Sequence, residues 1–315
     1  DNRRPVGGWR ELALTEDRYS TPAGVEAAIA AAARKAHATD PSGSVSDRIR
    51  QEYFRRFLSR IFSEEGDSDW LLKGGTGVLA RIGSARTTTD VDLFRKSRSL
   101  DAALDDLRRL AAIDLGDFFR FEYTAHETAV GGQQTYTKGY HVTFDVYVGA
   151  SGRGSLSVDL VVNVVVTDDP TVTPPANALD LPKLTSHDYR LYPVVDQIAD
   201  KVCATLALYN GRPSSREWDL VDLVVLAVSE DVEGIKLRRA IVAEARVRNV
   251  DLPNSFVVPS QWGRRYAKDA RPIPACADFR SIDLAVQLMQ TFLEPVFRDE
   301  VAGQTWNPAN CAWTG

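Results

Sequence analysis

The sequence contains few cysteines and no long apolar run, and both absences exclude classes of protein. Three cysteines stand far apart, with no CxxC pair and no histidine nearby, at Cys203, Cys276 and Cys311. This spacing argues against a disulfide framework or a zinc site and fits a reducing cytoplasm. The densest apolar run, 158–166, is interrupted by Asp159 and Asn163 and falls short of the ~18 residues of a membrane helix. We therefore expect a soluble cytoplasmic protein with no membrane partner.

An excess of positive charge is also absent. The 315 residues include 38 Lys and Arg against 43 Asp and Glu, which gives a formal net charge of −5. This balance excludes a uniformly basic nucleic-acid coat, although it allows a local basic surface. Apolar residues make up 44% and charged residues 26%, proportions that exclude a largely disordered chain. A chain of this length is near the limit for one hydrophobic core, so we expect two joined lobes.

The hydrophobic pattern changes along the chain and predicts an α+β protein in three regions. Residues 1–45 read as an arm and one helix that begins at Thr21-Pro22. Residues 46–184 mix helical and β-rich runs, which predicts an α/β lobe with a mixed sheet. Residues 185–315 are almost wholly helical in pattern and predict a helical C-terminal lobe.

The individual elements follow from caps, periodicity and turn residues. The predicted helices cover 22–38, 46–64 (capped by Ser46), 78–82, 99–112, 194–209, 215–229, 232–248, 259–268 and 281–301. The predicted strands cover 70–73, 87–94, 118–129, 140–148 and 156–165, with turns at Gly131-Gly132 and 151–154.

A glycine loop follows the first predicted strand. In Lys73-Gly74-Gly75-Thr76 the backbone amides are unblocked, a hydroxyl is present, and a helix begins directly afterwards. Free amides at the positive end of a helix suit a phosphate group. A tight turn without a ligand is the alternative for this loop when it is considered alone.

Two aspartates follow fifteen residues after Gly75, in Asp90-Val91-Asp92. On a strand both carboxylates point to one face, with Cβ atoms roughly 6.5 Å apart. Two like charges on one face of an apolar strand favour a metal ion or a cationic partner as compensation. The alternative is an exposed edge strand with two solvated acids. A glycine loop, a short helix and a DxD strand form the order expected of a nucleotidyltransferase palm, which usually needs a third acid.

Two aspartates in later strands are candidates for that third acid. Asp159 alternates with apolar residues in 156–161, and Asp145 does the same in 141–146. Asp159 lies in the more apolar strand, where an unpaired acid costs more free energy, so we prefer it. Asp145 remains the alternative.

The helical half contains one further group of charges. Lys201 is a cation in an otherwise apolar helix and suits phosphates, although a salt bridge explains it equally well. Asp219 and Asp222 lie three residues apart on one helical face, so one of them can hold Lys201 or contact a nucleotide. Asp219 can instead be only a surface partner of Arg216.

Taken in order, five segments resemble the AbiEii/MenT-type nucleotidyltransferase toxins of bacterial type IV toxin–antitoxin systems. The segments are KGGTGVLAR, RTTTDVDLF, SVDLVV, DQIADKVCA and SREWDLVDL. The resemblance spans about residues 46 to 228. It implies a polymerase-β-like palm and a Mg²⁺-dependent enzyme that transfers a nucleotide from an NTP to RNA, in several members to the 3′ end of tRNA. Such a toxin blocks translation, and a cognate antitoxin neutralises it.

The resemblance also implies roles for individual residues. The phosphate loop of the family corresponds to Lys73, Gly74, Gly75 and Thr76, and its two-metal site corresponds to Asp90, Asp92 and Asp159. The lysine of its third motif corresponds to Lys201, and the acid of its fourth motif corresponds to Asp222 or Asp219. Asp159 is also the candidate base, and Lys201 the candidate phosphate ligand. Two other functions stay open: a small-molecule nucleotidyltransferase of the aminoglycoside type, with an acidic acceptor pocket, and a non-catalytic nucleotide-binding module.

A basic segment offers a surface for RNA. Between Ser229 and Pro272, nine Lys and Arg stand against six acids, and Trp262 and Tyr266 lie in the same segment. Such a segment can contact phosphates and stack on exposed bases. A solvated helix face is the alternative.

Overall fold

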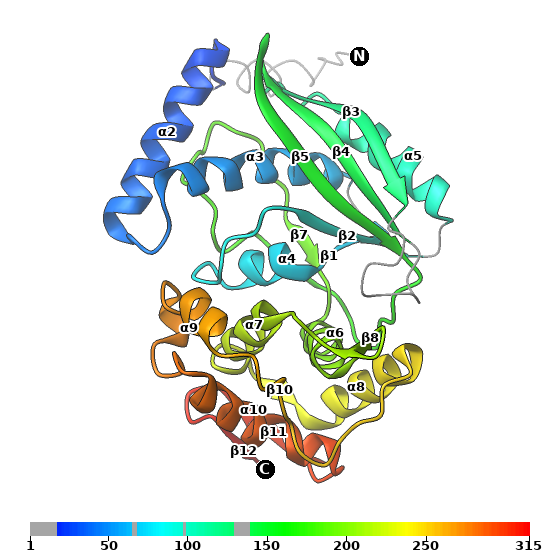
Figure 1. Ribbon diagram of the computed structural model, residues 1–315. Coiled ribbons are helices and arrows are strands. Elements are labelled where there is room, and N and C mark those ends of the chain that lie inside the picture. The colour runs from blue at the N-terminus through cyan, green and yellow to red at the C-terminus, as the bar shows by residue number, and fades with distance from the viewer. Residues whose placement is uncertain (1–17, 65–67, 97–98, 129–138) are drawn as a thin grey trace, which may run out of the picture.

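The computed structural model describes residues 18–64, 68–96, 99–128 and 139–315. Most of the predicted N-terminal arm and the predicted Gly131-Gly132 turn therefore lie outside the described residues. Within the described ranges the chain folds as a mixed α+β protein, as the sequence predicts, with a large sheet in one half and helices in the other (Figure 1).

The helices agree with the predicted ones in number and order over the described ranges. They are α2 (Pro22–Thr39), α3 (Val45–Ile61), α4 (Gly74–Arg81), α5 (Leu100–Ala111), α6 (Val194–Leu206), α7 (Glu217–Ala227), α8 (Gly234–Arg248), α9 (Arg264–Ala270) and α10 (Ile282–Phe297), with a short 3-10 helix at Pro274–Cys276. The predicted cap of α3 is wrong. Ser44, not Ser46, caps it, because the Ser44 hydroxyl accepts a hydrogen bond from the Asp47 backbone N–H at 3.0 Å.

The seven strands of the large sheet mix parallel and antiparallel pairs. Their order is β3 (Phe119–Thr128), β4 (Gly139–Val148), β5 (Ser151–Val162), β2 (Val91–Arg95), β1 (Trp70–Leu72), β7 (Tyr189–Leu191) and β6 (Thr171–Thr173). The pairs β2–β5 and β1–β7 are parallel, and the other pairs are antiparallel. The parallel pairing of β2 with β5 brings together two strands that lie far apart in the sequence.

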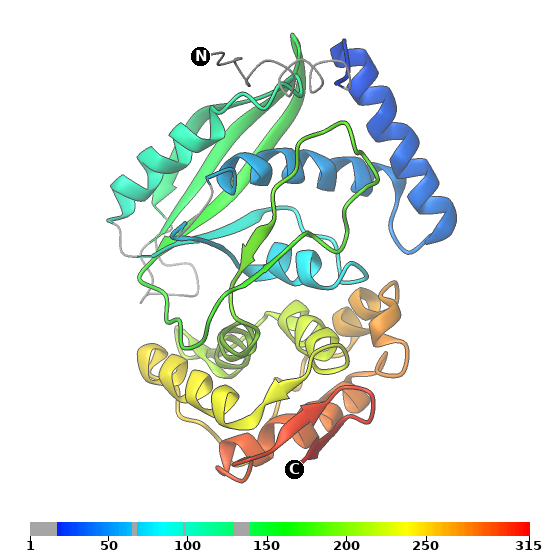
Figure 2. The same cartoon turned by 180° about the vertical axis from the view of Figure 1, so that it is seen from behind.

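One face of the sheet is covered by helices. Figures 1 and 2 show α3 and α5 on the same side of the strands. Val91, Leu93 and Val158 are fully buried in the core on this side. Because side chains alternate along a strand, Asp92 and Asp159 are turned to the opposite face. The sheet therefore presents carboxylates on the side that α3 and α5 do not cover.

The helical half has its own hydrophobic core, formed mainly by α6, α7, α8 and α10. Helix α4 contributes to both cores, since Val78 and Leu79 pack in the helical one and Ala80 packs under the sheet. The predicted domain boundary between residues 184 and 185 stays a prediction, and β7, which follows it, still belongs to the large sheet. No helix in the described ranges is long and apolar enough to cross a membrane.

The second half is less helical than predicted. Helix α6 ends at Leu206 because Asn210 and Gly211, with φ of 52° and 74°, turn the chain into a hairpin of β8 (Leu208–Tyr209) and β9 (Arg212–Pro213). A second small sheet joins β10 (Val232–Glu233), β11 (Thr305–Asn307) and β12 (Ala312–Thr314). Helices α9 and α10 are also displaced from their predicted ends, at 264–270 instead of 259–268 and 282–297 instead of 281–301.

Two predicted strand starts are wrong, and the predicted turn at 151–154 lies inside a strand that ends at Val162 rather than at residue 165. Strand β5 begins at Ser151 rather than at residue 156, because the hairpin turns at Gly149, with φ of 59°, and Ser151 pairs directly with Val148. Strand β2 begins at Val91 rather than at residue 87. There the Thr88 hydroxyl lies 3.3 Å from the Asp90 backbone N–H, a local turn that replaces strand pairing.

Candidate active site

A cavity of about 730 Å³ lies between the helical half and the face of the sheet that α3 and α5 do not cover. We call it the first cavity. It brings together most of the residues singled out in the sequence: Lys73, Gly74, Gly75, Asp90, Asp92, Asp159, Lys201 and Asp219. Three other candidates, Thr76, Asp222 and Asp145, do not line it. The first cavity is therefore the candidate active site.

The glycine loop is the first turn of a helix. Helix α4 begins at Gly74 rather than at residue 78 as predicted, and its N-cap, Lys73, makes no side-chain capping bond. Among the described residues, no acceptor binds the backbone N–H groups of Gly74, Gly75 and Thr76. Gly74 and Gly75 line the first cavity, so the free end of the helix opens into it. This end favours an anion through its amides and its dipole.

Gly74 is confined by its backbone and by Asp92. Its φ is 60°, and a Cβ added there would lie 1.9 Å from Asp92 Oδ2. Gly74→Ala is therefore expected to destabilise the fold by about 1–3 kcal/mol and to displace the Asp92 carboxylate. Thermal unfolding together with a nucleotide-binding measurement checks both effects.

Gly303→Ala is the matched control for this substitution. Gly303 has a similar φ of 73°, but no atom lies within 4 Å of the position of an added Cβ. Gly303→Ala should lower the free energy of unfolding only through its strained backbone and should leave nucleotide binding unchanged. Equal nucleotide binding by the two alanine variants would contradict the close contact between Gly74 and Asp92.

Thr76 connects the glycine loop to the aspartates. Its hydroxyl donates a hydrogen bond of 2.6 Å to the backbone carbonyl of Asp90. The Thr88 hydroxyl lies 2.9 Å from Asp90 Oδ1. These contacts fix Asp90 just before β2, so it is not a strand residue as predicted. A phosphate-binding role for Thr76 stays a prediction, since its hydroxyl already serves the backbone.

The carboxylates on the sheet wall influence one another. Asp92 and Asp159 are register partners on the parallel strands β2 and β5, and Asp90 precedes Asp92 by two residues. Burial, then the charge of Asp90 and then that of Asp159 raise the pKa of Asp92 to about 7. Among the described residues, no group donates a hydrogen bond to the Asp92 carboxylate. The charges of Lys73 and Lys201 lower the pKa of Asp92 but do not offset its burial and its acidic neighbours.

These acids fit a hard divalent cation in chemistry but do not form a closed site. In the ranges that the structure describes, no three Asp, Glu, His or Cys side chains are grouped closely enough to hold a metal ion. Mg²⁺ prefers carboxylate oxygens and usually takes only one or two from the protein, with substrate phosphates completing its shell. The oxygen donors and the raised pKa of Asp92 fit that ion.

The two candidates for the third acid lie in different places relative to the first cavity. Asp159 lies beside Asp92 and lines the first cavity. Asp145 lies on β4, opposite Ser155 of β5 and Glu122 of β3, and outside the cavity. Asp159 has one partner that sequence reasoning missed, since its Oδ1 lies 2.7 Å from His141 Nδ1. Cross-strand pairing in β4 and β5 places that histidine, and nothing in its sequence neighbourhood indicated it.

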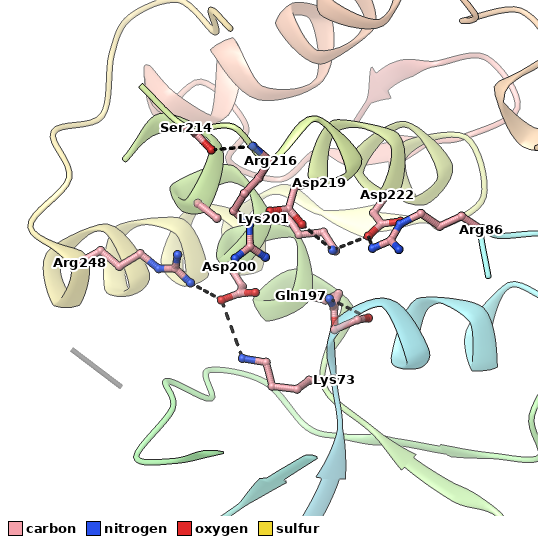
Figure 3. A network of polar contacts seen from close by, with 12 residues as sticks. Lys73, Arg86, Gln197, Asp200, Lys201, Ser214, Arg216, Asp219, Asp222 and Arg248 are labelled. Carbon is pink, nitrogen blue, oxygen red and sulfur yellow. Dashed lines mark hydrogen bonds and ion pairs between the residues drawn. The ribbon is translucent and has the colours of Figure 1, made fainter. Parts of the chain in front are cut away.

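The opposite wall of the cavity carries a buried charge network (Figure 3). Lys201 Nζ lies 2.6 Å from Asp222 Oδ2 and 3.1 Å from Asp219 Oδ1. Asp222 also accepts two hydrogen bonds from Arg86, at 2.8 and 2.9 Å. Burial opposes the charge of Lys201, but Asp222 and then Asp219 raise its pKa above the ordinary value. Both acids therefore hold Lys201, and Asp222, fully buried, faces Arg86 and Lys201 rather than the cavity.

A second group of charges joins the glycine loop to the helical half. Asp200 accepts a hydrogen bond from Arg248 and lies 3.9 Å from Lys73 Nζ (Figure 3). Burial opposes its ionisation, but Lys73 and then Arg248 hold the pKa of Asp200 well below its usual range. Sequence reasoning missed Asp200, Arg86 and Arg248. Asp200 directly precedes Lys201, so its place in the helix was the available signal.

The predicted RNA-stacking aromatics are wrong. Trp262 is 6% exposed and Tyr266 is fully buried. The Trp262 indole donates to the Ser214 carbonyl at 3.0 Å, and the Tyr266 hydroxyl donates to the Phe279 carbonyl at 2.6 Å. The polar atoms of both side chains bind backbone carbonyls inside the helical core. Because both rings are buried there, neither offers a face on which a base can stack.

Comparisons with known proteins identify the family of the chain. The family profile described as nucleotidyl transferase AbiEii toxin, type IV TA system, matches residues 56–302. No curated protein sequence matches the chain. MenT4, a nucleotidyltransferase toxin from Mycobacterium tuberculosis H37Rv, has a similar structure, with 16% identity, a TM-score of 0.47, and coverage of 81% of this chain and 93% of that one.

Two Helicobacter pylori structures are also similar. A putative nucleotidyltransferase has 17% identity and a TM-score of 0.35, with 63% of this chain and 80% of that chain covered. JHP933 has 15% identity and a TM-score of 0.36, with 75% and 92% covered. The family match itself spans most of the chain, including every residue of the first cavity. The protein belongs to the AbiEii nucleotidyltransferase toxin family of type IV toxin–antitoxin systems.

Proposed function

We propose that the protein is a Mg²⁺-dependent toxin that transfers a nucleotide from an NTP to the 3′ end of an RNA, preferably a tRNA, in the cytoplasm. The transfer blocks translation, and a cognate antitoxin neutralises the toxin. One observation carries this proposal. The sheet wall of the first cavity carries the carboxylates of Asp90, Asp92 and Asp159. Its helical wall carries Lys201 and Arg216 together with Asp200 and Asp219, and the open end of α4 lies between the two walls.

This division of charge matches a nucleoside triphosphate with its metal. The amides of Gly74 and Gly75 offer donors to phosphate oxygens, and Lys73 and Lys201 supply positive charge beside them. When bound by Asp90, Asp92 and Asp159, Mg²⁺ would supply activation of the acceptor hydroxyl and neutralisation of the leaving pyrophosphate. The protein residues position both reactants and hold the fixed charges that the reaction needs.

The ammonium group of Lys201 is held in a fixed position on the wall of the cavity. Its Nζ is fixed between Asp219 and Asp222. Arg86 donates to both oxygens of Asp222, and Arg216 donates to the Asp219 oxygen that Lys201 does not contact. The group of five side chains carries three positive and two negative charges. A net positive charge fixed on the wall of a cavity stabilises phosphates without reorganisation.

Substitution of the two candidate third acids tests the sheet wall. Purified protein with labelled NTPs, Mg²⁺ and total RNA is expected to label RNA. Asp159→Asn should reduce labelling roughly 100-fold or more, because mutating even a residue that only hydrogen-bonds to a metal ligand lowers activity by up to about 100-fold. Asp145→Asn, the same chemical change outside the cavity, should retain transfer. Equal loss in both variants would contradict the assignment of Asp159.

The acceptor in the same assay decides the reaction class. Labelled RNA supports the proposal. Label that appears only on small molecules would support an aminoglycoside-type transferase, and Mg²⁺-dependent NTP binding without any transfer would support a non-catalytic module. Sequencing the tRNA 3′ ends after expression of the protein in cells identifies the nucleotide that was added.

A further inference from the structure

A second cavity, of about 550 Å³, opens beside the first. The two cavities share Arg86, Thr87 and Trp218 among their lining residues, so they adjoin at these residues. The second cavity lies between the start of α3, the segment after α4, and α9. Both ribbon views place α9 next to the α2–α3 loop and the end of α4 (Figures 1 and 2).

The lining of the second cavity is basic although the protein is acidic. Its cationic residues are Arg48, Arg55, Arg86, Arg265 and Lys268, and its acidic residues are Asp40, Asp47 and Asp269. Five positive against three negative charges leave an excess of two in a chain whose net charge is −5. Arg55 and Arg86 are paired with Glu52 and Asp222, which do not line the cavity, so the positive charge open to a phosphate lies on the α9 side.

The charges on α9 are the ones available to a ligand. Arg265 Nε lies 3.6 Å from Asp269 Oδ2, a long contact between an exposed side chain and a half-buried one. Lys268 has no ion-pair partner among the described residues. By contrast, Arg48 binds Asp40 at 3.1 Å, and Arg86 is held by Asp222. Arg265 and Lys268 are therefore the groups that a bound phosphate chain would contact at the lowest cost.

An aromatic ring stands where the two cavities meet. Trp218 is half-buried in the first turn of α7. The guanidinium of Arg265 lies 4.7 Å from its ring centroid, and that of Arg216 lies 5.9 Å away. Indole rings and guanidinium planes are the surfaces on which unpaired nucleobases stack. Trp218 lines both the second cavity and the cavity that holds the carboxylates.

We propose that the second cavity binds the backbone of a single-stranded RNA acceptor end, and that Trp218 stacks on a base next to the reacting nucleotide. The inference rests on the proposed function and deepens it, because it gives the acceptor a path separate from the NTP. Phosphate contacts from Arg265 and Lys268 are independent of sequence. A basic groove is also the opposite of the acidic pocket expected for an aminoglycoside acceptor.

The test compares two charge-reversed variants. Arg265→Glu with Lys268→Glu is expected to raise the KM for total tRNA about 10-fold and to leave the KM for the NTP within about twofold. The salt slope of log affinity should become shallower by about 1.4, since each single-strand phosphate contact contributes about 0.7. Arg34→Glu with Arg246→Glu carries the same charge change at exposed positions outside both cavities, and should change neither quantity.

Trp218→Ala is expected to raise the KM for tRNA about 10-fold, and Trp218→Phe should restore most of the loss because phenylalanine still stacks. An increase in the NTP KM alone would assign the ring to the incoming nucleotide and overturn its role in the acceptor path. If the wild type labels RNA but the Arg265/Lys268 variant matches its control, only the second-cavity inference fails. If the wild type labels no RNA, both proposals fail.

Discussion

Asp92→Asn is expected to abolish nucleotide transfer and, at the same time, to make the metal-free protein more stable. The loss of transfer should be at least about 100-fold, because the substitution removes a central acid of the proposed metal site. The stability gain should reach roughly 2–4 kcal/mol in EDTA at about pH 8. Activity and thermal unfolding measured on the same preparation check both parts.

The gain in stability follows from the pKa of Asp92. Burial, then Asp90 and then Asp159 raise it from 3.8 to about 7. Below pH 3.8 the carboxyl is protonated in both the folded and the unfolded chain, so its charge costs nothing. Between pH 3.8 and about 7 only the unfolded chain releases the proton, and stability falls as the pH rises. Above about pH 7 the penalty is constant.

The pH profile and a control variant make this prediction specific. The melting temperature of Asp92→Asn should exceed that of the wild type by a margin that grows from about pH 4 to 7 and then stays level. Asp251→Asn, at an exposed position away from the cavity, should follow the wild type throughout. Added Mg²⁺ should stabilise the wild type but not Asp92→Asn. A variant that is less stable than the wild type at every pH would refute the unbalanced charge at Asp92.

Lys201→Met is expected to lower the free energy of unfolding by about 3 kcal/mol and to remove transfer activity. The substitution leaves the Asp219 and Asp222 carboxylates buried and facing each other without the ammonium group between them. Removing one partner of a buried ion pair costs about 3–5 kcal/mol, and here the remaining arginines limit the loss. Chemical denaturation gives the magnitude.

A double-mutant cycle with Asp222→Asn separates stability from chemistry. The double variant removes both the ammonium and one of the repelling charges, so part of the lost stability should return, with a coupling energy of about 2 kcal/mol. Transfer should stay absent, because the positive charge beside the phosphates is still missing. Additive losses of stability would show that Lys201 and Asp222 do not stabilise each other.

Local sequence patterns predicted the parts of the site that depend on one element. Alternation in β2 was enough to place Asp92 on the face opposite Val91 and Leu93, because strand geometry fixes that relation. The glycine loop was also predicted from local sequence alone, although the helix that follows it starts at Gly74 rather than at residue 78. Hydrophobic periodicity also predicted the mixture of helices and strands, since each element carries its own pattern.

The contacts between distant elements could not be predicted in this way. Asp92 and Asp159 meet because β2 pairs in parallel with β5, a choice that neither strand encodes alone. Arg86 reaches Asp222 across 136 residues, and Arg248 reaches Asp200 across 48. In the sequence each looked like an ordinary surface charge. Only the fold shows that these arginines are the counterions that keep the cavity wall in place.

The shared position of α4 links the interior of the protein to its chemistry. One side of this helix packs among the helices of the C-terminal half and another under the sheet, and its first turn carries the amides that we propose bind phosphate. Repacking of either interior would shift those amides, and interiors are too densely packed to absorb such a shift locally. Substitutions far from the reactants therefore alter turnover when they repack either interior.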